Sequence, residues 1–190
     1  MNLKTKLKKT AVLGLIGGIL ILAPGCSKAT ESDSPSSNTS SSKITEFNDT
    51  TGWTPFTFAA TDSVGQISTK HPSSGYTSTA TEEGVEILTN QTLTITNAST
   101  NFYKTMYTML LTTVKDKVEE SLSGADDTTW VVNSGTVIDE DGDTTYLRSY
   151  QTEKNSKVYL FLASNTTSTA LTAEQVKEAN TIMYHTTIPE

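Results

Sequence analysis

The chain has 190 residues, with 14 basic and 21 acidic side chains, 35% hydrophobic residues and one cysteine. This length suits one domain of ordinary size with some additional chain, and a single cysteine excludes an intramolecular disulfide or a cysteine-based zinc site. The excess of acid argues against the basic surface that nucleic-acid binding requires, so no nucleic acid is expected among the partners.

Residues 1–25 have the pattern of a secretory signal peptide. Met1–Thr10 carries four lysines and no acidic residue, and Ala11–Ala23 is an uncharged apolar run of 13 residues. Such a run spans about 20 Å as a helix, against a bilayer core of roughly 30 Å. The pattern therefore predicts a signal peptide and not a permanent transmembrane helix.

The segment Leu22–Cys26, with the sequence LAPGC, resembles the lipobox of bacterial lipoproteins, in which a small residue precedes an invariant cysteine. The resemblance implies cleavage between Gly25 and Cys26 and attachment of a diacylglyceryl group, with acyl chains such as palmitate, to the Cys26 thiol. Ala23 stands where the common box has leucine, so the alternative is another kind of signal peptide or an uncleaved anchor.

The resemblance also implies a location at the cell membrane. The protein is expected to be lipid-anchored through Cys26 and to face outside the cytoplasm, at the outer membrane if the source is Gram-negative. Two acyl chains on one residue give stable anchoring, which one chain does not.

Residues 26–43 are expected to form the lipidated cysteine and a disordered tether. Ser27–Lys43 is rich in serine and has no aromatic residue, leucine, isoleucine or valine, so it cannot bury enough apolar surface to fold. After removal of the signal peptide the chain keeps 21 acidic and 10 basic residues, a net charge of −11. This charge favours solubility and repulsion from an anionic envelope.

Residues 44–190 are expected to form one globular domain that begins with strands. Trp53–Phe58 alternates aromatic and small polar residues, and Pro55 places this strand at an edge. Gln66–Tyr76 is rich in turn residues. Gly84–Leu88 and Thr92–Thr96 predict two paired strands.

The apolar spacing then changes to three and four residues. Over Thr100–Ser121 this spacing predicts a helix of about six turns that ends near Gly124. Its apolar stripe is expected to be core: Tyr103, Met106, Tyr107, Leu110, Val114, Val118 and Leu122.

The C-terminal part predicts a hairpin, a strand and a last helix. Thr129–Ile138 and Thr144–Tyr150 flank a turn at Asp141-Gly142, and Asn155–Ala163 is apolar enough for a central strand. Thr172 and Gln175 have capping-box spacing, with Val176, Ala179 and Met183 on the inner face of the helix that follows. The order of elements predicts an α+β fold: an antiparallel sheet of about five to six strands with two helices packed on one face.

Asp139, Asp141 and Asp143 form a weak candidate calcium site. An EF-hand loop with its glycine at Gly142 would begin at Val137 and end at Arg148, and neither residue supplies the carboxylate that the motif requires. We therefore favour a solvated hairpin tip and expect no metal and no other cofactor.

No catalytic residue is selected by the sequence. His71 and His185 are interpreted as structural residues, with the charge of His185 suited to the end of the last helix. A carboxylate pair for glycoside cleavage is open because its members meet only in space. The candidates for such a pair are Glu82, Glu83, Glu86, Glu119 and Glu120.

Four aromatic residues could contact a sugar or a peptide, although half-buried core positions are favoured for them: Trp53, Tyr76, Trp130 and Tyr146. In composition the globular part resembles small lipoproteins of Gram-positive bacteria whose function is not known. Our hypothesis is a non-enzymatic surface module that binds a ligand, or an envelope protein or glycan partner. The alternatives are a small cell-envelope hydrolase that uses a carboxylate pair and a domain that masks another protein.

Overall fold

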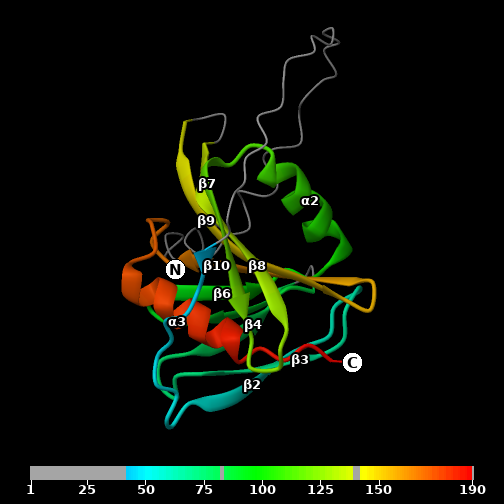
Figure 1. Ribbon diagram of the computed structural model, residues 1–190, viewed down its shortest axis with the longest axis vertical. Coiled ribbons are helices and arrows are strands. Elements are labelled where there is room, and N and C mark those ends of the chain that lie inside the picture. The colour runs from blue at the N-terminus through cyan, green and yellow to red at the C-terminus, as the bar shows by residue number, and fades with distance from the viewer. Residues whose placement is uncertain (1–41, 82–83, 139–141, 190) are drawn as a thin grey trace, which may run out of the picture. The chain divides into compact units, whose positions relative to one another are not determined.

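The computed structural model describes residues 42–81, 84–138 and 142–189 (Figure 1). Cys26 and the whole of the predicted signal peptide lie outside these residues. Within the described ranges, an eight-stranded sheet is accompanied by a two-stranded sheet and two helices.

The strands of the large sheet lie side by side in an order that differs from their order in the chain. In space they are β1 (Ser42–Lys43), β7 (Lys115–Ser123), β8 (Thr129–Ile138), β9 (Thr144–Lys154), β10 (Lys157–Asn165), β6 (Leu93–Asn97), β5 (Glu86–Thr89) and β4 (Thr77–Ala80). The small sheet pairs β2 (Thr54–Phe58) with β3 (Ile67–His71). The helices are α2 (Asn101–Leu111) and α3 (Ala173–Tyr184).

The α+β class and the presence of two helices are confirmed, but the prediction of an antiparallel sheet of five to six strands is wrong. The described large sheet has eight strands and is mixed, because β1 runs parallel to β7. Ser42 and Lys43, which form β1, were assigned to the tether. Their backbone pairs with Glu120 and Ser121 of a strand that lies far away in sequence, a contact that no local pattern contains.

The two helices pack on opposite faces of the large sheet, whereas one face was predicted for both. Ser149 and Tyr150 are neighbours in β9, so their side chains point to opposite faces. The Tyr107 hydroxyl of α2 bonds to the Ser149 hydroxyl. The Tyr150 hydroxyl donates to Asn180 Oδ1 of α3 at 2.8 Å. The sheet therefore lies between α2 and α3 (Figure 1).

The second half of the helix predicted over Thr100–Ser121 is strand β7. Thr100 caps α2, but the helix ends at Leu111 and the strand begins at Lys115. Val114, Val118 and Leu122 are four residues apart. Four is a multiple of the strand period of two and is also close to the helix period of 3.6, so this spacing fits both structures.

The predicted hairpins, the central strand and the capping box are confirmed. Strands β5 and β6 pair as a hairpin, and so do β8 and β9. Strand β10 lies inside the sheet, between β9 and β6. At the start of α3, Gln175 N–H donates to Thr172 Oγ1 at 3.3 Å, and Thr172 N–H donates to Gln175 Oε1 at 2.8 Å. These two bonds complete the predicted capping box.

The main core lies between the large sheet and the layer made by α3 and the small sheet. Its largest side chains are fully buried, and Phe161 at its centre contacts Trp130 and Phe58 edge-on, with ring centroids 5.8 and 5.2 Å away. Ala179, Ile182 and Met183 of α3 close this core from outside. On the other face, Tyr103, Met106 and Tyr107 are the buried residues of α2.

Gly135 in β8 is required by the close approach of the chain that enters β7. A Cβ atom at this position would lie 2.4 Å from Val114 Cγ1 and 2.7 Å from the Lys115 carbonyl oxygen. Because one of these atoms belongs to the backbone, relief requires a shift of the strand. We expect Gly135→Ala to lower the free energy of unfolding by about 2 kcal/mol, measured by urea denaturation. Gly65→Ala is the control, since the nearest atom to its Cβ is 3.9 Å away; equal losses in the two variants would contradict this account.

Candidate functional site

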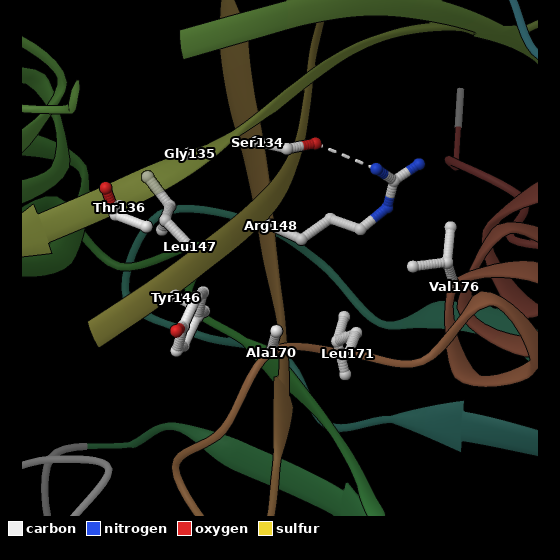
Figure 2. A pocket seen from close by; sticks show the side chains of 9 residues that line it. All are labelled: Ser134, Gly135, Thr136, Tyr146, Leu147, Arg148, Ala170, Leu171 and Val176. Carbon is white, nitrogen blue, oxygen red and sulfur yellow. Dashed lines mark hydrogen bonds between the residues drawn. The ribbon is translucent and has the colours of Figure 1, made fainter. Parts of the chain in front are cut away.

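An open cavity of about 240 Å³ lies on the face of the sheet that carries α3. It is bounded by the middle of β8, the facing part of β9 and the segment that leads into α3 (Figure 2). The lining residues of β8 and β9 are neighbours across the two strands, because Ser134 pairs with Arg148 and Thr136 pairs with Tyr146. The antiparallel register therefore brings residues 134–136 of β8 next to residues 146–148 of β9 at the cavity.

The walls of the cavity are mostly apolar. Ala170 and Leu171 line it from the segment that leads into α3, Val176 lines it from α3, and Tyr146 lines it from β9 with 41% of its surface exposed (Figure 2). Among the predicted aromatic contact residues, Tyr146 is the one that borders this cavity. Trp130, by contrast, is fully buried in the core, where a half-buried position was favoured from the sequence.

Arg148, the chain's single arginine, lies at the end of the cavity nearest α3. Its guanidinium donates to groups on three strands and a helix. Nε–H donates to the Tyr150 hydroxyl at 2.9 Å, and Nη2–H donates to Asn180 Oδ1 at 2.8 Å. Nη1–H donates to Ser134 Oγ at 2.8 Å and to Glu120 Oε2 at 3.3 Å. These contacts hold the guanidinium in one orientation.

The neutral partners and the charged partner of Arg148 differ in how closely they approach. Its three neutral acceptors lie at 2.8–2.9 Å, while Glu120 contributes one oxygen at 3.3 Å. The Arg148 side chain is 7% exposed and that of Glu120 is 25% exposed. The positive charge is therefore fixed by neutral groups and is balanced by a single carboxylate that water can reach.

Burial also acts on the hydroxyl of Tyr150. Desolvation raises the pKa of the Tyr150 phenol, while the neighbouring Arg148 acts in the opposite direction. The net direction is upward, so Tyr150 keeps its proton and serves as a donor to Asn180.

Sequence reasoning named Tyr146 but did not identify Arg148 as a site residue. Arg148 appeared there only as the residue that breaks an EF-hand pattern. The available signal was a lone arginine inside an otherwise uncharged strand stretch, since arginine in such a place is usually paired. The partners could not be deduced, because they come from β7, β8, β9 and α3.

Of the candidate metal ligands, Asp143 is exposed next to the start of β9, while Asp139 and Asp141 lie outside the described residues. Across the described ranges, no three histidine, cysteine or acidic side chains are grouped so that they could hold a metal ion. Gly25 and Cys26, the predicted cleavage and lipidation residues, also lie outside the described part of the chain.

The candidate carboxylates are not brought together in pairs where the structure describes them. Glu119 and Glu120 are neighbours in β7 and therefore point to opposite faces of the sheet. Glu86 lies on β5, near the other edge of the sheet, and accepts bonds from Ser78 Oγ and Ala59 N–H. Glu82 and Glu83 fall outside the described ranges.

Neither histidine is among the residues that line the cavity. His71 ends β3, and its Nδ1 is 2.7 Å from the Pro72 carbonyl oxygen. His185 forms the C-cap of α3, where a positive charge was expected to suit the helix dipole. Burial and the nearby Lys70 instead lower the pKa of His185. The His185 imidazole therefore has a higher pKa in the unfolded chain than in the folded one. Lowering the pH through the range in which histidine takes up a proton is expected to lower the free energy of unfolding.

Within the described residues no helix is long and apolar enough to cross a membrane. Comparison with known protein families, curated proteins and solved structures finds no match to this chain.

Proposed function

We propose that the protein is a membrane-anchored extracytoplasmic lipoprotein whose folded domain is a non-enzymatic ligand- or partner-binding module. In this proposal the lipid on Cys26 holds the chain at the membrane, and residues 27–41 connect the lipid to β1. The signal-like N-terminus and the lipobox resemblance support the anchor. The cavity between β8, β9 and the start of α3 supports the binding role.

The observation that carries the binding role is an open, mostly apolar cavity next to a half-exposed aromatic ring. Ligand sites in proteins are typically concave and apolar, with a few polar groups in fixed positions. Here the apolar part comes from Leu171, Val176 and Tyr146, and the fixed polar groups come from Ser134 and Arg148. Ser134, Tyr146 and Arg148 lie on strands and Val176 lies on α3, while Leu171 belongs to the segment that leads into α3. Most of the site therefore stands on regular elements, which favours a preformed site.

Occupancy of the cavity by 1-hexanol tests the binding role. We expect a Kd on the order of 1 mM, because five or six CH₂ groups leaving water contribute about 0.8 kcal/mol each. The measurement is the shift of the backbone amide resonances of Leu171 and Val176 during titration of the soluble domain. Lys157, exposed on β10 and not among the cavity-lining residues, is the reference position. Shifts no larger at Leu171 than at Lys157 would contradict the assignment of the cavity as a binding site.

A further inference from the structure

The geometry points to a carboxylate-bearing amphiphile as the ligand of this cavity: an anionic head at Arg148 and a short apolar tail along Leu171, Val176 and Tyr146. This inference rests on the proposed function, because it assumes that the cavity binds a ligand, and it adds the chemical class of that ligand.

The head position follows from the surroundings of Arg148. Tyr150, Asn180 and Ser134 fix the guanidinium, so the side chain loses little further conformational entropy when an anion binds. Glu120 shows that a carboxylate oxygen can reach Nη1 from the partly exposed side. Its single contact of 3.3 Å is long for a charge-assisted hydrogen bond, which usually measures about 2.7–2.9 Å. A ligand carboxylate can therefore compete with Glu120 for this place.

The position of the apolar tail follows from the apolar residues that line the cavity. Ala170, Leu171 and Val176 present aliphatic groups, and the Tyr146 ring adds an aromatic surface from β9 (Figure 2). The cavity is open and has a volume of about 240 Å³. This space suits a short chain or one branched aliphatic group, and a long acyl chain would extend beyond it.

The expected preference for an anionic head depends on direct contact with Arg148 and not on the net charge of the domain. The mature chain is acidic overall and repels anions at a distance. At physiological ionic strength, however, exposed charges more than about 8 Å apart are largely screened. The guanidinium of Arg148 is less than 10% exposed, so its interaction with an anion in contact is screened much less.

The test compares three six-carbon probes on the soluble domain: hexanoate, 1-hexanol and hexylammonium. We expect hexanoate to bind about tenfold more tightly than 1-hexanol, the effect of one additional charge-assisted hydrogen bond, and hexylammonium to bind more weakly than both. The carboxylate could belong to a free fatty acid, which hexanoate imitates, or to a peptide C-terminus, which N-acetylleucine imitates. N-acetylleucine is therefore titrated as a fourth probe to distinguish these two sources. Tighter binding than 1-hexanol by either carboxylate supports the inference.

Variants at two neighbouring glutamates sharpen the comparison. Glu120→Ala removes the competing carboxylate, so the affinity for hexanoate is expected to rise several-fold while that for 1-hexanol stays unchanged. Glu119→Ala is the matched control, because Glu119 points to the other face and is paired with Lys117. If Glu120→Ala does not fold, the carboxylate head is tested by the ratio of hexanoate to 1-hexanol affinity in the unmodified domain.

The outcomes separate the two proposals. Equal affinities for hexanoate and 1-hexanol would overturn the carboxylate head and leave the cavity as an apolar binding site. Binding of neither probe would overturn both the ligand class and the binding role. An equal gain in hexanoate affinity in Glu119→Ala and Glu120→Ala would assign the effect to net charge and overturn the role of Arg148.

Discussion

Replacing Cys26 by serine is expected to abolish lipid attachment completely and to remove the protein from the membrane. The lipobox resemblance implies that the lipid is carried by the Cys26 thiol, and the chain has no second cysteine that could replace it. Without acyl chains, the membrane affinity that they supply, about 0.8 kcal/mol for each buried CH₂ group, is lost. Intact mass of the protein purified from its own membranes, together with incorporation of labelled palmitate, measures the effect.

Ser27→Ala is the control for this experiment, because it alters the adjacent residue and keeps the thiol. It should retain the mass of a chain that begins at Cys26 and carries a diacylglyceryl group, with any further acyl chain. The anchoring proposal fails if the Cys26→Ser protein still incorporates palmitate. It also fails if the unmodified protein has the mass of the full chain or of a cleaved chain without lipid.

Replacing Arg148 by methionine is expected to lower the free energy of unfolding by about 3 kcal/mol. Methionine fills much of the same volume but donates no hydrogen bond, so Glu120 and Ser134 lose their partner. The bond from the Tyr150 hydroxyl to Asn180 remains and limits the loss. Partial exposure of Glu120 limits it further, because water solvates the unpaired carboxylate. Urea denaturation at neutral pH measures the difference.

Lys157→Met is the matched control, since it removes one positive charge from an exposed position at the start of β10. It should change stability by less than about 0.5 kcal/mol. Adding Glu120→Gln to Arg148→Met should recover part of the loss, because the uncompensated charge disappears. A loss in Arg148→Met no larger than in Lys157→Met would show that the hydrogen bonds of Arg148 contribute nothing measurable to folding.

The candidate site was only partly visible in the sequence. Tyr146 could be named because an aromatic residue in a predicted hairpin strand is a recognisable feature. Glu120 was considered only as a member of a catalytic pair, and Glu119 was considered with it. Their alternation across β7 separates them, and it places Glu120 alone on the face that carries Arg148.

The sequence by itself determined the elements whose signals lie within a few residues. The capping box at Thr172 and the hairpin between β8 and β9 are of this kind, because their hydrogen bonds join residues close in the chain. Strand β10 is marked by its own apolar run, although one of its partners in the sheet, β6, is distant in sequence. The signal peptide and the lipidation of Cys26 also rest on a short local pattern, and they stay predictions.

Tertiary structure alone decided where the chain changes from α2 to β7, because apolar residues four apart suit both structures. It also decided that β1 joins the sheet, that α2 and α3 cover opposite faces and that four elements meet at Arg148. Each of these outcomes depends on contacts between segments far apart in sequence. Such contacts form only when burial of the whole core compensates for the entropy of bringing those segments together.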